Sequence, residues 1–61
     1  MKRSKLIQHL TKNGCVLLRE GSRHSIWKNE NNGEMTAVPL HSEIKDFMAH
    51  KICKDLKIEL P

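Results

Sequence analysis

Residues 15–38, CVLLREGSRHSIWKNENNGEMTAV, decide the fold of this 61-residue chain. Turn signals at residues 20–22 and 29–33 divide the stretch into three short runs rich in apolar and β-branched residues. The runs are residues 15–19, 24–28 and 35–38. This pattern predicts a three-stranded antiparallel meander. Pro39 ends the third strand, because proline has no amide hydrogen to donate to the ladder.

A short helix is predicted before the meander. Ser4 is a good N-cap, since its hydroxyl can accept a hydrogen bond from an unpaired amide of the first turn. Leu6, Ile7 and Leu10 then recur at helical spacing. The Asn13-Gly14 pair supplies a residue that can adopt the left-handed conformation in which helices commonly end.

A second helix is predicted after the meander. Ser42 is its expected N-cap, and Glu43 lies in the first turn, where a negative charge suits the helix dipole. The helix is expected to run to Lys57. Its amphipathic stripe consists of Ile44, Phe47, Met48, Ile52 and Leu56.

The predicted fold class is α+β, with the order α-β-β-β-α. Neither helix can bury its apolar stripe alone, so both should pack on one face of the three-stranded antiparallel sheet and leave the other face open. Double-stranded RNA-binding domains share this architecture. No linker, repeat or low-complexity segment divides residues 1–61, which we expect to form one domain.

The size and composition of the chain limit its function. A domain this small buries only about 60% of the surface of its unfolded chain, so a shallow surface site is expected rather than a deep cavity. No stretch is apolar enough to span a membrane, and the amphipathic N-terminal segment is unlike a signal peptide. A cytoplasmic location is expected, with Cys15 and Cys53 as two buried thiols.

Charge is distributed unevenly along the chain. Residues 1–28 hold seven basic residues against one acidic residue, a net charge of +6, whereas residues 29–61 carry −2. A positive field concentrated in half of a small domain favours a polyanion such as nucleic acid. The alternative, an ordinary solvated basic surface, stays open on composition alone.

His24 is the main catalytic candidate. It opens the second predicted strand after the turn that ends in Ser22-Arg23, so its imidazole should be reachable and could transfer protons near neutral pH. The alternative is a surface histidine at a strand end. His41, before the second helix, is more readily explained as a residue that holds the loop. The histidine spacing fits no zinc motif, and neither a metal nor a cofactor is expected.

Two segments give the chain a resemblance to the HicA (YcfA-like) toxin family. The first is Gly-Ser-x-His-x-Ile-aromatic, at residues 21–27, and the second is Pro-x-His-x-Glu-Ile, at residues 39–44. With the apolar pair on the first helix and the apolar run from residue 14 onwards, the resemblance covers essentially the whole chain. The two segments are specific in combination, in this order and at this spacing.

The resemblance implies a toxin of a type II toxin–antitoxin system, a metal-independent endoribonuclease that cleaves mRNA and is neutralised by a HicB-type antitoxin. It implies that His24 is the catalytic residue. The residues expected to bind RNA are the bases Arg23, Lys28, Lys5 and Arg3. Ser22 and His41 are possible supporting residues.

Two other functions remain as alternatives. One is a non-catalytic module that binds double-stranded RNA by shape. Such modules usually place a lysine cluster at the start of the last helix, where this chain has two acids, Glu43 and Asp46, beside Lys45. The other is a small DNA-binding or protein-interaction factor, although about 28 residues of strand and turn signals between the helices do not fit a helix-turn-helix.

Overall fold

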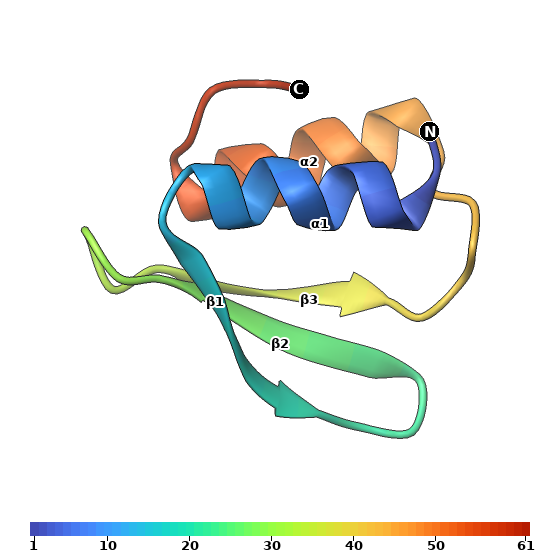
Figure 1. The fold of residues 1–61 in the computed structure, drawn as a ribbon, viewed down its shortest axis with the longest axis horizontal. Helices are drawn as coiled ribbons and strands as arrows, with labels where there is room; N and C mark the ends of the chain where they lie inside the picture. Colours follow the sequence, from blue (N-terminus) through green and yellow to red (C-terminus); the bar gives the residue numbers. More distant parts are fainter.

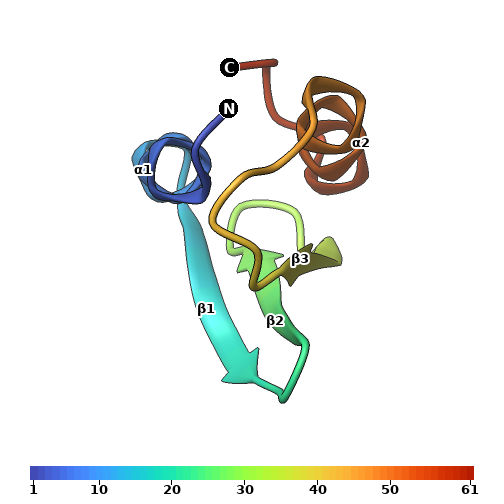
Figure 2. The same cartoon turned by 90° about the vertical axis from the view of Figure 1, so that its right-hand side faces the viewer.

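Three strands and two helices follow one another in the predicted order in a computed structural model that describes all 61 residues. The elements are α1 (Arg3–Lys12), β1 (Cys15–Glu20), β2 (His24–Asn29), β3 (Met35–Pro39) and α2 (Asp46–Leu56). The strands form one antiparallel sheet in the order β1-β2-β3. Both helices cover the same face of the sheet (Figures 1 and 2), so the other face is open. The predicted α-β-β-β-α fold is confirmed.

Strand β2 divides its side chains between the two faces. Ser25, Trp27 and Asn29 point toward the helices and are buried, whereas His24 is exposed and Lys28 is only half-buried. Successive strand residues face opposite sides of a sheet, so this alternation follows directly from strand geometry. We call the helix-covered side the inner face and the opposite side the outer face.

One hydrophobic cluster lies between the inner face and the helices. Its members are Leu6, Leu10, Cys15, Trp27, Val38, Ile44, Ala49, Ile52, Cys53 and Leu56. The two cysteines are buried and unpaired, as predicted, and burial raises the pKa of both thiols. No helix in the structure is both long enough and apolar enough to span a membrane.

Helix α2 begins later than its sequence signals indicate, at Asp46 instead of just after Ser42. The preceding segment is extended, because Glu43 forms a β-bridge with Lys2 and the Ile44 amide donates to the Met1 carbonyl oxygen at 2.8 Å. The predicted Ser42 cap is therefore wrong. Long-range pairing with the N-terminal residues outweighs the local capping signal.

The later start also changes which face of α2 is buried. Ala49, Ile52, Cys53 and Leu56 form its buried stripe, at intervals of three and four residues. Phe47, expected in that stripe, lies outside it and is 67% exposed.

The start of α1 differs for the same reason. Lys2, with no side-chain capping hydrogen bond, stands at the N-cap position in place of Ser4. The Arg3 amide instead donates to the Ser42 carbonyl oxygen at 2.8 Å, so the loop before α2 satisfies a donor that a cap would otherwise satisfy. The predicted stop is confirmed: Asn13 is the C-cap, and Gly14 follows with φ +83°.

A β-bulge interrupts the pairing of β1 with β2. Leu17 pairs with Trp27, but the next pair is Arg19 with Ile26, so Leu18 is an extra residue in β1. Without the bulge, Arg19 would stand opposite the inward-facing Ser25. The bulge instead places Arg19 opposite Ile26 and so on the outer face.

Candidate active site

A tight turn presents His24 at the end of the sheet. The Gly21 amide donates to the His24 carbonyl oxygen at 2.8 Å, so these two residues close a turn whose tip is Ser22 and Arg23. A Cβ atom at position 21 would lie 3.0 Å from that same carbonyl oxygen. Glycine therefore allows the close approach of the two strands that places His24 at the start of β2.

His24 lines an open pocket of about 520 Å³ on this end of the molecule. The lining residues are Ser22, Arg23, His24, Leu40 and His41, and all five are exposed. Three of the residues singled out in the sequence, Ser22, Arg23 and His41, therefore lie in one pocket with His24.

The register of β2 and β3 explains why the two distant segments meet. His24 is the partner of Pro39, and the Leu40 amide donates to the Arg23 carbonyl oxygen at 3.2 Å. The antiparallel pairing thus continues one residue beyond β3. His41 follows directly, and its exposed side chain faces the pocket beside the Ser22-Arg23 turn.

Neither imidazole of the pocket is held by the protein. The one histidine ring nitrogen that makes a hydrogen bond within the chain is Nε2 of His9, which lies 2.8 Å from the Glu59 carbonyl oxygen. The ring nitrogens of His24 and His41 are therefore free to bond to a ligand.

Arg3 has a different environment from the one expected of an RNA contact. Its Nε donates to the Pro39 carbonyl oxygen at 2.8 Å, and Nη2 donates to Ser25 Oγ at 3.0 Å. Ser25 Oγ is fully buried and also accepts from Trp27 Nε1 at 3.0 Å. Arg3 thus connects Ser25, the residue next to His24 in β2, with Pro39, the residue paired with His24 in β3. Its side chain reaches both from the inner face. These bonds commit its guanidinium to positioning both strands.

The other basic residues lie at different distances from the pocket. Lys28 is on the outer face with His24, but four residues separate them, which is about 13 Å along a strand. Lys5 is exposed on α1 and lines neither the pocket nor the hollow beside it. Of the predicted bases, only Arg23 stands next to His24 in the pocket.

Arg19 is a cation of the outer face that the sequence did not single out. It pairs with Ile26, midway between His24 and Lys28 on β2. Arg19 on β1 and His24 and Lys28 on β2 thus place one imidazole and two cations on the outer face. No sequence signal marks the bulge at Leu18 that places Arg19 there.

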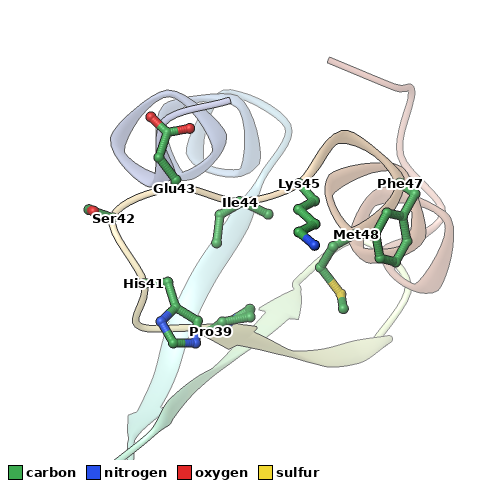
Figure 3. A pocket seen from close by; sticks show the side chains of 8 residues that line it. All are labelled: Pro39, His41, Ser42, Glu43, Ile44, Lys45, Phe47 and Met48. Carbon is green, nitrogen blue, oxygen red and sulfur yellow. The ribbon is translucent and has the colours of Figure 1, made fainter.

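A second hollow of about 500 Å³ adjoins the pocket, and His41 lies at the border of the two. In Figure 3 the His41 ring lies beside Pro39, while the Glu43 carboxylate points away from it. That carboxylate lies 3.6 Å from the N-terminal amine. Phe47 and Met48 line the far wall. No group of three or more His, Cys, Asp or Glu side chains gathers anywhere in the chain in a way that could hold a metal ion.

Comparison with known proteins adds one finding. The family model described as the HicA toxin of bacterial toxin–antitoxin systems matches residues 3–58, nearly the whole chain. No curated protein and no solved structure shows significant similarity to the chain.

Proposed function

This chain belongs to the HicA toxin family of bacterial toxin–antitoxin systems, and from that premise we propose that it is an endoribonuclease that cleaves mRNA. His24 is the proposed catalytic residue, and the reaction is proposed to need no metal ion. A HicB-type protein is the proposed antitoxin. The observation that carries the proposal is the exposed, unbonded His24 beside Arg23 in an open pocket.

The chemistry of RNA suits so shallow a site. RNA carries its own nucleophile, the 2′-hydroxyl, so cleavage requires proton transfer and stabilisation of charge at phosphorus rather than a bound water or cofactor. An imidazole can take the proton from the 2′-hydroxyl or give one to the departing 5′-oxygen. Arg23 lines the same pocket, from which its guanidinium would stabilise the phosphate during this transfer.

The remaining cations are proposed to bind RNA on either side of the cleaved bond. Lys28 is about 13 Å along the strand from His24, a spacing that suits contact with a neighbouring phosphate rather than with the cleaved one. Arg19 and Lys28 would contact neighbouring phosphates across the outer face, and Lys5 would add charge from α1. Ser22 and Arg23, at the turn, would contact the phosphate at the cleavage site.

The alternative of a non-catalytic double-stranded RNA-binding module has less support. Its phosphate contacts would require basic residues at the start of α2. The residues there include Glu43 and Asp46, whose carboxylates lie 3.6 and 3.5 Å from the N-terminal amine. A lone Lys45 beside two acids is a poor phosphate clamp.

Cleavage of an mRNA transcript by purified protein in the presence of EDTA tests the proposal. We expect His24→Ala to lower the cleavage rate about 100- to 10,000-fold, the usual contribution of a proton-transferring side chain. His50→Ala is the matched control, since His50 is exposed on α2 and lines neither hollow. Cleavage by His24→Ala at the wild-type rate contradicts the proposal. Binding of duplex RNA without cleavage by either protein favours the alternative module.

The proposed partner has its own test. A HicB-type protein, co-purified with this chain, should suppress cleavage of the transcript at equimolar concentration. A complex that cleaves RNA as fast as the free chain contradicts neutralisation by binding.

A further inference from the structure

The pocket contains a second imidazole with no other evident role. His41 was expected to hold the loop before α2, yet its ring makes no hydrogen bond to the protein. The loop is instead held by backbone bonds, from Arg3 to Ser42 and from Ile44 to Met1, and by the buried Ile44 side chain. A loop-fixing role therefore leaves the exposed ring unexplained.

Strand register determines where that ring lies relative to His24. His24 pairs with Pro39, and the next backbone bond joins Leu40 to Arg23. His41 is two residues beyond Pro39, directly after the last residue that bonds to the β2 side, and its side chain lines the same pocket as His24. Both rings therefore border one open space of about 520 Å³.

Charged groups around the two rings are few. Arg23 shares the pocket with both rings, and Lys45 lines the adjoining hollow. Glu43 also lines that hollow, but its carboxylate is directed toward the N-terminal amine. No carboxylate forms an ion pair with either imidazole, so the ring nitrogens of both are available to a bound phosphodiester.

We propose that His24 and His41 act together on one phosphodiester, one as general base and the other as general acid. This inference rests on the proposed ribonuclease function and assigns His41 a catalytic role within it. Two imidazoles that line one open pocket can stand on opposite sides of a bound phosphate, one near the attacking oxygen and one near the leaving oxygen.

The reaction balances without another reactant. The neutral imidazole takes the proton of the 2′-hydroxyl, and the 2′-oxygen forms a bond to phosphorus. The bond from phosphorus to the 5′-oxygen breaks, and the protonated imidazole gives its proton to that oxygen. The products are a 2′,3′-cyclic phosphate and a free 5′-hydroxyl. The two rings exchange protonation states, and solvent restores them.

The dependence of kcat/KM on pH tests the pairing. One neutral and one protonated imidazole give a bell-shaped profile for the wild type. His24→Ala and His41→Ala should each lower the rate about 100- to 10,000-fold and each remove one limb of the bell, the acidic limb in one variant and the alkaline limb in the other. A His41→Ala profile that keeps both limbs overturns the proposal, whatever its height.

A substrate with sulfur in place of the 5′-oxygen at a mapped cleavage site identifies the acid. A thiol ionises far more easily than an alcohol, with an ordinary pKa near 8.5, so a thiolate leaves without receiving a proton. The variant that lacks the general acid should therefore cleave this RNA nearly as fast as the wild type, whereas the variant that lacks the base should stay slow. Rescue of both variants, or of neither, overturns the pairing.

The two proposals fail in different ways. If His24→Ala is inactive while His41→Ala matches the wild type in rate and profile, only the role of His41 is lost. If the wild type does not cleave RNA, the ribonuclease function itself is contradicted. His50→Ala again serves as the control, and unchanged thermal unfolding of His41→Ala confirms that the loop keeps its structure.

Discussion

The two faces of the sheet differ in almost every property although the same strands build both. On the inner face, Ser25, Trp27 and Asn29 are buried, and each of their side chains makes hydrogen bonds. On the outer face, His24 is exposed, and Lys28 keeps part of its side chain in water. Stability and proposed chemistry therefore reside on alternate residues of one strand, so each can be altered separately.

Polar groups on the inner face show how completely that side is organised. Asn29 Nδ2 donates to the Leu56 carbonyl oxygen at 2.9 Å, and its Oδ1 accepts from the Asn31 amide at 2.9 Å. No buried side-chain nitrogen or oxygen lacks a hydrogen-bond partner. No layer covers the outer face, so its polar groups can hydrogen-bond to water and need no partner within the protein. They are therefore available to a ligand.

The largest expected effect on stability comes from the centre of the inner face. Trp27→Ala should lower the free energy of unfolding by about 3–5 kcal/mol, because it removes a buried aromatic ring and leaves a cavity. Urea denaturation followed by circular dichroism measures this change. Ile26→Ala, the adjacent residue on the outer face, is the control and should cost clearly less. Equal losses in the two variants contradict the division between faces.

Arg3 tests whether the inner face positions the site. Arg3→Met removes two hydrogen bonds, to Pro39 and Ser25, and should cost about 1–3 kcal/mol of unfolding free energy. Lys5→Met, on the exposed side of the same helix, should cost less than about 0.5 kcal/mol. Arg3→Met should also slow RNA cleavage, since it frees both strands beside His24. An Arg3→Met variant as stable as Lys5→Met rules out the positioning role.

Asp55 links α2 to the sheet in a pH-dependent way. Hydrogen bonds from Lys51 Nζ at 2.9 Å and Thr36 Oγ1 at 3.0 Å, with the charge of Lys51, lower the pKa of its carboxyl. A lowered pKa in the folded state stabilises the fold above the unfolded-state pKa, and that contribution is lost as the pH falls through the folded-state value.

Thermal unfolding at several pH values measures this contribution. Asp55→Asn should unfold at a slightly lower temperature than the wild type at pH 7, with the difference shrinking below about pH 4. Glu30→Gln, which removes an exposed acid with no partner in the structure, is the control. A difference that grows on acidification has the wrong sign and contradicts the assignment.

The smallest effects on stability belong to the outer cations. Arg19→Gln and Lys28→Gln should each change unfolding free energy by less than about 0.5 kcal/mol. Each should nevertheless weaken RNA binding and reduce the salt dependence of the affinity by about 0.7 in the slope of log K against log salt concentration. Lys54→Gln, on α2, should leave binding unchanged. RNA affinity that is insensitive to Arg19 and Lys28 would exclude the outer face as the binding surface.

Much of the fold was predictable because its signals are local. The Asn13-Gly14 stop, the turn at residues 29–33 and the period-two pattern of β2 each depend on residues close together in the chain, and the structure confirms them. The start of α2 was not predictable in this way, although its end, expected at Lys57, agrees with the structure, where Lys57 is the C-cap. Ser42 and Glu43 have the character of a helix start, but pairing with residues 1–3 holds them extended.

The candidate site likewise has some features that neighbouring residues predict and others that depend on the tertiary structure. An exposed histidine after a glycine turn can be identified from neighbouring residues alone, and so can the adjacent Arg23. Strand register and one bulge decide three other features of the site. They bring His41 to the pocket, place the hydrogen bonds of Arg3 on the inner face, and place Arg19 on the outer face. Register is a relation between two strands, and the residues next to each other in the chain do not specify it; His24 and its partner Pro39, for example, are separated by a whole hairpin. Local propensity specifies each segment and its turns. The packed core then aligns those segments with one another, and this alignment decides which side chains share a pocket.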